Sequence, residues 1–243
     1  MKKAIIAGAT SGIGREVAKI LLSEGWQLGL AGRREDELNA LKALAPERIS
    51  TETLDVTEAD APQRLHQLIR QTGGMDLFFL ASGIGYQNEE LQSDIEVRTV
   101  RTNVEGFVRM VTAAFHFFRD RSGGHIAVIT SVAGTKGMSS APSYSASKRF
   151  QSTYIEALAQ LARTQKLPIR FTDIRPGFVQ TPLLDKNRHY PMLMEVGFVA
   201  RQIVKALKKA KRITVIDRRY ALLVFFWRLI PGWAWERIRL VKK

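Results

Sequence analysis

The chain has no cysteine, few histidines and no long apolar segment, and each absence excludes a class of protein. Its 243 residues hold no disulfide framework, no catalytic thiol and no cysteine-ligated metal. The four histidines are scattered and show no metal-ligand spacing, so we expect no metal site. No run approaches the roughly 20 apolar residues that span a bilayer, and no secretory segment follows Met1. These absences predict a cytoplasmic protein.

Positive charge is concentrated at one end of the chain. The formal net charge is +14. From Arg201 onward there are 13 Lys/Arg and 2 Asp/Glu, which leaves the first 200 residues nearly neutral. We therefore expect the C-terminal part to meet an anionic partner, while the rest of the chain has an ordinary globular composition.

A glycine-rich turn follows the first apolar segment. Residues 4–7 are apolar and end in Gly8, after which Gly12 and Gly14 open a stretch with apolar residues at helical spacing. Glycines let the backbone approach a pyrophosphate, and a helix N-terminus offers it N–H groups. The G-x-x-x-G-x-G spacing differs from the commoner G-x-G-x-x-G dinucleotide fingerprint, and three glycines alone also occur in ordinary turns.

Two arginines follow the second expected strand, residues 27–31. Dinucleotide-binding folds often place an acidic residue at the end of this strand, where it binds the ribose hydroxyls. Here Gly32 occupies that place and is followed by Arg33 and Arg34. A guanidinium pairs well with phosphate, so the pair favours NADP(H). The alternative is a solvated pair that opens the polar helix expected at residues 35–44.

Strands and helices alternate along the first 200 residues. Apolar segments at residues 49–54, 76–80, 126–130 and 168–174 read as buried strands, and helical patterns occupy residues 60–71, 93–118 and 144–165. This alternation predicts an α/β fold with a single doubly wound parallel sheet and helices on both faces. Its ligand site should lie at the carboxyl ends of the strands. We expect a helix at 199–211 and a last strand at 213–216.

Tyr144 and Lys148 lie four residues apart in one of these helical segments. Residues at this spacing share a helix face, with Cβ atoms roughly 5–6 Å apart. An ammonium group close to a phenol would lower the tyrosine pKa and make Tyr144 a better proton donor. The pair alone would more often be a surface Tyr and Lys, so this interpretation depends on the other motifs.

These motifs together resemble the short-chain dehydrogenase/reductase family over residues 3 to 182. The glycine turn matches, with Ala7 where threonine is usual, and Ser131 lies 13 residues before Tyr144. The family's Asn-Asn-Ala-Gly segment reads Leu-Ala-Ser-Gly here, with Ala81 in place of the asparagine that steadies the sheet. The resemblance implies a Rossmann-type fold with four catalytic residues, Asn103, Ser131, Tyr144 and Lys148.

The resemblance also implies a role for each catalytic residue. Ser131 hydrogen-bonds the carbonyl oxygen of the substrate, and Tyr144 delivers a proton to it. Lys148 lowers the Tyr144 pKa and binds the nicotinamide ribose, while Asn103 holds a water that links Lys148 to a proton relay. The implied NADP(H) site consists of Gly8, Thr10, Ser11, Gly12, Ile13, Gly14, Arg33, Arg34, Asp55, Val56, Ala81, Ser82, Gly83, Tyr144, Lys148, Pro176, Gly177, Val179 and Thr181.

Residues after Gly177 are expected to select the substrate. An apolar, methionine-rich segment at about 178–198 suits a lid over a hydrophobic or lipid-like ketone, although such residues also pack into cores. We divide the chain into a catalytic domain, 1–218, and a basic aromatic tail, 219–243. Tryptophans among arginines suit a membrane surface on the inner membrane face, so we expect peripheral contact there. The alternative is a tail that covers the pocket or a subunit interface.

The sequence therefore predicts an NADPH-dependent reductase of a hydrophobic ketone. One alternative is a 3-oxoacyl-carrier-protein reductase, whose acidic partner would meet the basic surface. Another is a non-catalytic NADP(H)-binding sensor or scaffold. No nucleic-acid motif accompanies the basic tail, so we do not expect nucleic-acid binding. The resemblance implies a homodimer or homotetramer through the helices of Asn103 and Tyr144, for which the candidate contacts are Phe107, Phe115, Phe118, Phe150, Tyr154 and Leu158.

Overall fold

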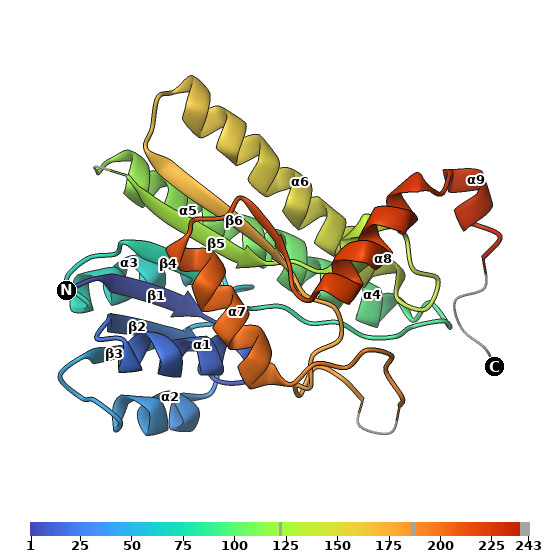
Figure 1. Cartoon of the computed structure of the whole chain (residues 1–243). Helices are drawn as coiled ribbons and strands as arrows, with labels where there is room; N and C mark the ends of the chain where they lie inside the picture. Colours follow the sequence, from blue (N-terminus) through green and yellow to red (C-terminus); the bar gives the residue numbers. More distant parts are fainter. Residues whose placement is uncertain (122, 186–187, 239–243) are drawn as a thin grey trace.

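Seven parallel strands form one sheet in the order β3-β2-β1-β4-β5-β6-β7 (Figure 1). The computed structural model describes residues 1–121, 123–185 and 188–238. The order reverses beside β1, which pairs with both β2 and β4, and this doubly wound arrangement is the predicted fold. The strands are Lys3–Ala7 (β1), Gln27–Gly32 (β2), Ile49–Thr53 (β3), Leu77–Leu80 (β4), Gly124–Ile129 (β5), Ile169–Arg175 (β6) and Ile213–Val215 (β7).

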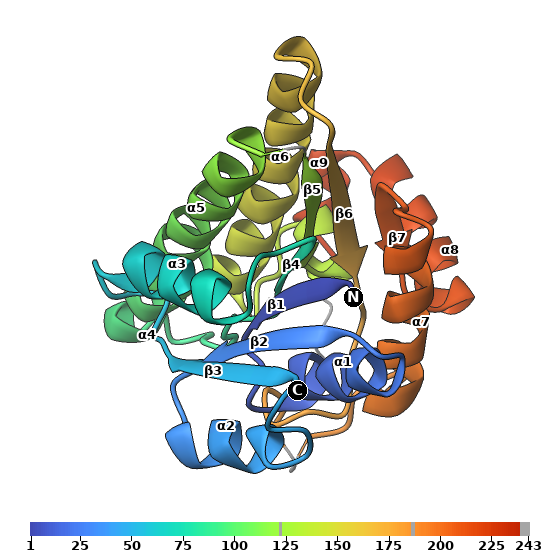
Figure 2. The ribbon, with the colours of Figure 1, turned by 90° about the vertical axis from the view of Figure 1, so that its left-hand side faces the viewer.

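Helices cover both faces of the sheet. Figure 2 shows α3, α5 and α6 on one side and α1 and α7 on the other. Successive residues of a strand point to opposite faces, so Ile5 packs into the core beneath α3 and α5 while Ile6 packs into the core beneath α1 and α7. The helices before the C-terminal segment are Gly12–Ser23 (α1), Glu35–Lys42 (α2), Ala61–Gln71 (α3), Ser93–Val100 (α4), Phe107–Arg119 (α5), Pro142–Thr164 (α6) and Val196–Lys208 (α7).

The helix predicted at residues 93–118 is interrupted at its centre. Between α4 and α5 the residues Arg101–Gly106 form a π-helical turn, and Asn103 lies within it. Hydrogen bonds in a π-turn span five residues, which widens the helix, and such turns often occur at functional sites. The last residue of the turn, Gly106, packs closely against Val56. A Cβ at this position would lie 2.8 Å from the Val56 side chain, so there is little room for a residue other than glycine. The apolar periodicity predicts the helix and gives no sign of the wide turn.

The C-terminal segment differs most from the sequence expectation. Helix α7 begins and ends three residues earlier than predicted. Its start is fixed by Glu195, which caps the N-terminus by accepting a hydrogen bond from Gly197 N. The tail contains two further helices, Arg218–Leu229 (α8) and Gly232–Trp235 (α9). The proposed boundary between residues 218 and 219 therefore falls in the first turn of α8. Residues 239–243 of the predicted tail lie outside the described residues.

Candidate active site

A cleft of about 460 Å³ lies at the carboxyl ends of the central strands. Its walls come from the glycine turn after β1, the loops after β2, β3 and β4, the end of β5, helix α6 and the start of the lid. Every residue of the expected cofactor site lines it, together with Ser131, Tyr144 and Lys148. Asn103, the fourth expected catalytic residue, is fully buried behind the wall.

The glycine turn is held in a shape that only glycine permits. Gly8 has a φ of 90° and Gly12 a φ of 53°, a region that other residues avoid. A Cβ on Gly14 would fall on the Gly8 carbonyl, and one on Gly8 would lie 2.6 Å from the Ser82 backbone nitrogen. The turn therefore presents bare backbone at the N-terminus of α1, and this cradle fits a dinucleotide pyrophosphate.

The loop after β4 packs directly against this turn. Ala81 N and Ser82 N both donate to the Ala7 carbonyl, at 2.8 and 3.1 Å. A Cβ on Gly14 would lie 3.1 Å from the Ala81 methyl group. The small side chain at the position where the family has asparagine therefore sits against the glycine turn, and backbone hydrogen bonds fix the loop.

Two guanidinium groups stand at the far end of the cleft. Arg34 Nη2 donates to Thr10 Oγ1 at 3.0 Å, while Arg33 Nη1 lies 3.7 Å from Asp55 Oδ2. A Cβ on Gly32 would lie 2.6 Å from the Thr10 methyl group, so Thr10 occupies the space into which an acidic side chain on β2 would extend. The carboxylate of Asp55 is oriented by Thr57, whose N and Oγ1 donate to Oδ1 at 2.9 Å each. This end of the cleft fits a phosphate on the adenosine ribose.

Ser131 and Tyr144 face each other at the other end of the cleft. Ser131 caps a short 3₁₀ helix by accepting from Ala133 N at 3.1 Å. Burial raises the pKa of Tyr144, and a hydrogen bond with Ser131 lowers it by less. Gly85 lies against the phenol ring, because a Cβ there would be 2.6 Å from Tyr144 Cδ2. The hydroxyls of both residues are thus placed together on one wall.

The expected effect of Lys148 on Tyr144 is not found in this structure. Lys148 Nζ donates to Ile129 O at 3.1 Å and to Gln151 Oε1 at 3.0 Å, and it lies 5.7 Å from the centre of the Tyr144 ring. Burial is the largest influence on Tyr144 and raises its pKa. Burial also lowers the pKa of Lys148 to about 8, although the Asp173 carboxylate opposes this.

Gln151 joins Lys148 to Asn103 through a hydrogen-bonded bridge. While Gln151 Oε1 accepts from Lys148, Gln151 Nε2 donates to the Asn103 carbonyl at 2.8 Å. The three residues are at most 4% exposed. The side-chain amide of Gln151 therefore connects Lys148 to Asn103. The family resemblance had implied a water in this role. Sequence reasoning missed Gln151, although it lies three residues after Lys148 on the same helix face.

The side chain of Asn103 clamps the loop that carries Gly85. Its amide nitrogen donates to Ile84 O at 2.7 Å, and its oxygen accepts from Ile84 N at 2.9 Å. The same nitrogen donates to Ser147 Oγ at 3.1 Å. Asn103 is thus a positioning residue here: it fixes the loop against which the Tyr144 ring packs.

A second cavity of about 290 Å³ adjoins the Tyr144 ring. Its lining combines the aromatic and aliphatic side chains of Tyr86, Leu183, Leu184 and Tyr190 with the polar residues Gln87, Asp185 and Arg188. Two methionines of the lid differ in burial: Met194 is buried in the core, whereas Met192 is partly buried against it. The expected apolar lid is therefore partly core and partly cavity wall.

Tyr220, from the tail, holds the lid and the turn before it. Its hydroxyl accepts from Phe178 N at 3.1 Å and donates to Pro191 O at 3.0 Å. A Cβ on Gly177 would fall inside the Tyr220 ring, so the aromatic ring lies on the glycine backbone. The start of α8 therefore supports the wall of the site from behind, through Gly177 and Phe178. The sequence motif around Gly177 gives no indication of this partner.

The residues expected at a subunit interface are mostly interior. Phe107, Phe115 and Phe118 are at most 4% exposed and pack against the sheet. Phe150 is 37% exposed and stacks on Tyr154 with ring centres 5.6 Å apart. The three phenylalanines of α5 therefore belong to the core. Only Phe150, of these four phenylalanines, lies at the surface of the described chain.

Known proteins resemble the chain in sequence and in fold. The short chain dehydrogenase family model matches residues 2–191. An uncharacterized oxidoreductase of Myxococcus xanthus is 36% identical over 201 residues, covering 80% of this chain and 79% of that protein. The structure of ElxO with NADP bound gives a TM-score of 0.79 at 21% identity, covering 91% of this chain and 99% of that chain.

A further solved structure shares the fold. The 3-ketoacyl-(acyl-carrier-protein) reductase from Brucella melitensis, complexed with NADH, gives a TM-score of 0.79 at 21% identity. The alignment covers 89% of this chain and 96% of that chain. The cleft described above lies at the carboxyl edge of this common sheet.

Proposed function

The chain belongs to the short-chain dehydrogenase family, and we propose that it is an NADP(H)-dependent oxidoreductase that interconverts a hydrophobic ketone and a secondary alcohol. The family accounts for the dinucleotide cleft and the oxidoreductase class. The NADP(H) dependence and the carbonyl chemistry are supported by one continuous cleft, which has arginines at one end and the Ser131–Tyr144 wall at the other.

The two arginines support NADP(H) as the cofactor. Arg33 and Arg34 line the cleft beyond the glycine turn, and Thr10 takes the space where a ribose-binding carboxylate would extend. A 2′-phosphate there would gain charge-assisted hydrogen bonds, whereas NAD(H) would not. ElxO was solved with NADP and the Brucella reductase with NADH, so related folds accept either dinucleotide.

The catalytic wall supplies the proton and the polarisation for carbonyl reduction. The bound nicotinamide would supply the hydride, which reaches the carbonyl carbon as negative charge develops on the oxygen. The Ser131 hydroxyl hydrogen-bonds that oxygen, and the Tyr144 hydroxyl donates its proton to it. A raised Tyr144 pKa keeps the phenol protonated at neutral pH. Lys148, which Gln151 holds in the lining of the cleft, would hydrogen-bond the nicotinamide ribose hydroxyls.

The cavity beside Tyr144 supports a hydrophobic substrate. Its walls include Tyr86, Leu183, Leu184 and Tyr190, and it lies beside the ring of Tyr144. A site with apolar walls and a few directed polar groups is the usual arrangement for small-molecule ligands. A ketone with an alkyl chain would place its carbonyl at Tyr144 and its chain along the lid.

The proposal is tested with purified full-length protein and a panel of ketones of increasing chain length. We expect NADPH oxidation that increases with apolar chain length and is slower with NADH. Including a 3-oxoacyl thioester, free and carried on an acyl-carrier protein, distinguishes a general ketone reductase from a carrier-protein reductase. Tight NADPH binding without turnover of any panel member would favour the sensor or scaffold instead.

A further inference from the structure

Helix α8 is apolar on both of its sides. Its inner side is buried against the protein through Tyr220 and Val224, at 2% and 4% exposure. The opposite side, which we call the outer face, consists of residues at i, i+3, i+4 and i+7 spacing that are 54–64% exposed: Leu222, Phe225, Phe226 and Leu229. A helix with apolar residues all round is normally enclosed by protein or lipid, yet here half of it is uncovered.

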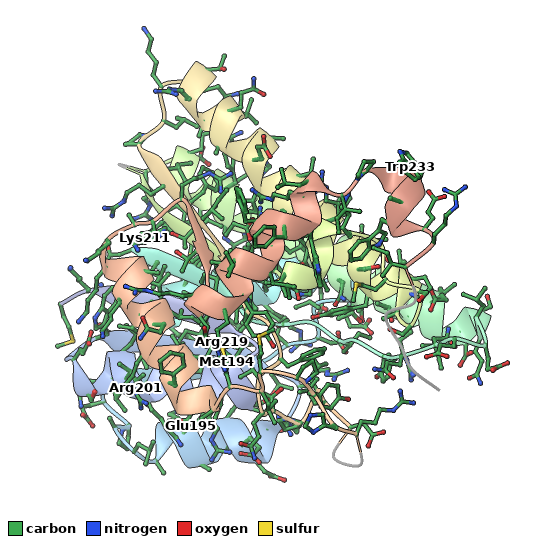
Figure 3. The ribbon with its side chains drawn as sticks, turned by 45° about the vertical axis from the view of Figure 1, so that its right-hand side comes forward. Met194, Glu195, Arg201, Lys211, Arg219 and Trp233 are labelled. Carbon is green, nitrogen blue, oxygen red and sulfur yellow. The ribbon has the colours of Figure 1, made fainter. Side chains whose placement is uncertain are left out.

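The apolar surface continues into α9. Trp235 is buried, and its Nε1 donates to the Gly137 carbonyl at 2.7 Å. Lys136 Nζ donates to Ile230 O at 2.7 Å, so the turn between α8 and α9 is fixed on the loop after Ser131. Trp233, two residues before the anchored tryptophan, is 66% exposed. Figure 3 shows Arg219 and Trp233 at opposite ends of this tail.

Basic residues surround the outer face. The described residues from 218 to 238 include four arginines and one glutamate. Arg218 and Arg228 are exposed on α8, and the Arg237 guanidinium lies 5.6 Å from the centre of the Trp233 ring. Arg219 is also exposed, but its guanidinium is ion-paired with Asp217 at 2.6 Å. Exposed aromatic and aliphatic groups rimmed by cations match the interface of an anionic bilayer, where rings enter the headgroup region and cations meet lipid phosphates.

The charge argues against a second copy of the chain as the occupant. In a two-fold interface the same patch lies on both subunits. Pairing the outer faces would bring the arginine rims of two copies together, and like charges across an interface are unfavourable. An anionic lipid surface meets the same rim favourably. None of the helices among the described residues is long and apolar enough to cross a membrane, so contact at the surface is the relevant mode.

We propose that the outer face of α8, with Trp233 and the surrounding arginines, docks the protein on an anionic membrane surface. The same helix holds the lid through Tyr220, so the docking surface is connected directly to the lid beside the apolar cavity. A lipid-like ketone would then reach the cavity from the membrane to which the enzyme is bound. Docking itself is independent of whether the reaction proposed above is right.

The test is vesicle flotation of the full-length protein at low salt. Vesicles of phosphatidylcholine with a quarter phosphatidylglycerol should bind the protein, and vesicles of phosphatidylcholine alone should bind it much less. Added salt should weaken the binding, because lipid and protein charges are screened. Failure to float with the anionic vesicles, or equal binding to both kinds, would overturn the proposal.

Two variants examine the outer face separately. Phe225→Ser with Phe226→Ser should reduce vesicle partitioning on the order of tenfold or more, because two exposed rings are lost. Arg228→Ala should reduce it about fivefold. The matched control, Leu44→Ser with Val97→Ser, removes two apolar residues that are 59% and 53% exposed elsewhere, and should bind like the unaltered protein.

Folding and self-association are checked on the same samples. NADPH binding and the melting temperature should be unchanged in all variants, because the altered side chains are exposed. Sedimentation measures the oligomeric state. An oligomer that dissociates in the Phe225/Phe226 variant, with vesicle binding unaffected, would instead assign the outer face to a second copy and overturn the membrane assignment.

Discussion

The two ends of the cleft are built in different ways. At the glycine turn, the walls are backbone, held by glycine conformations and by hydrogen bonds within a few strands. At the lid, the walls are side chains. The backbone that carries them is held by Tyr220, which lies 42 residues after Phe178 and 29 residues after Pro191. The first end binds a group common to a whole family, whereas the second must fit one substrate. A site made of backbone therefore leaves a short motif in the sequence. A site made of side chains that pack from distant elements leaves none.

The largest effect is expected where the two ends meet, at Tyr144. Tyr144→Phe removes the proton donor and should lower kcat for carbonyl reduction by roughly 10²–10⁴-fold, the usual contribution of a positioned general acid. NADPH affinity, measured by fluorescence titration, should remain close to that of the unaltered protein. The matched control is Tyr154→Phe on the same helix, whose hydroxyl bonds to Thr112 and not to the cleft. Retention of most activity in Tyr144→Phe would show that the proton comes from another group.

The next effect examines the two arginines that lie beyond the glycine turn. Arg33→Ala with Arg34→Ala should raise the KM for NADPH by roughly 10–100-fold, because charge-assisted hydrogen bonds are lost. The KM for NADH and for the ketone should change little. Lys42→Ala removes an exposed cation from the same helix region and serves as the control. Equal losses for NADPH and NADH would mean that the arginines do not bind the phosphate.

Gln151→Leu breaks the bridge between Lys148 and Asn103 with little change of volume. Lys148 loses its proton as pH rises through about 8, so reduction should decline above that pH in the unaltered protein. Without Gln151 Oε1 the charged ammonium loses an acceptor, its pKa falls, and the alkaline decline should move to lower pH by about one unit. We expect a roughly fivefold lower kcat at pH 8, because the protonated fraction of Lys148 falls from about one half to about one tenth.

The pH profile separates positioning from mere stability. If Gln151 only supports the fold, Gln151→Leu should lower the melting temperature and leave the alkaline decline where it was. Gln160→Leu, at an exposed position of the same helix, is the control. If Gln151→Asn restores the pH profile, the role assigned to the bridge is supported, since the shorter amide keeps the same donor and acceptor.

The smallest effect concerns the lid. Tyr220→Phe keeps the ring against Gly177 but removes the hydroxyl that serves Phe178 N and Pro191 O. Leaving that N–H without its acceptor costs about 1–3 kcal/mol of unfolding free energy. For a chain of this size the melting temperature should fall by about 2–4 °C per kcal/mol. The KM for a hydrophobic ketone should rise a few-fold while the KM for NADPH stays constant; a change in NADPH alone would contradict the assignment.

Much of the fold and of the cleft was predictable from the sequence. Continuous apolar segments between amphipathic helices predict a parallel sheet, and the carboxyl ends of its strands collect the loops that follow them. Glycine positions such as Gly8 and Gly12 are predictable because the conformation they permit is a property of the residue itself. The same approach missed the π-helical turn at Asn103, since a turn of 6 residues is too short to show an apolar period of its own within a longer helical pattern. It also missed α8, whose apolar residues surround the helix and leave no amphipathic pattern.

The sequence by itself determined the sheet, the glycine turn and the arginine pair, because each depends on local conformational preference or on a short spacing. The set of Ser131, Tyr144 and Lys148 was implied by the resemblance of the sequence to a family. Only the tertiary structure decided which acceptors hold Lys148. Gln151 reaches the carbonyl of Asn103, 48 positions away along the chain, and Tyr220 reaches Phe178, 42 positions away. Such contacts arise from packing of whole elements, and the burial that comes with them raises the pKa of Tyr144 and lowers that of Lys148.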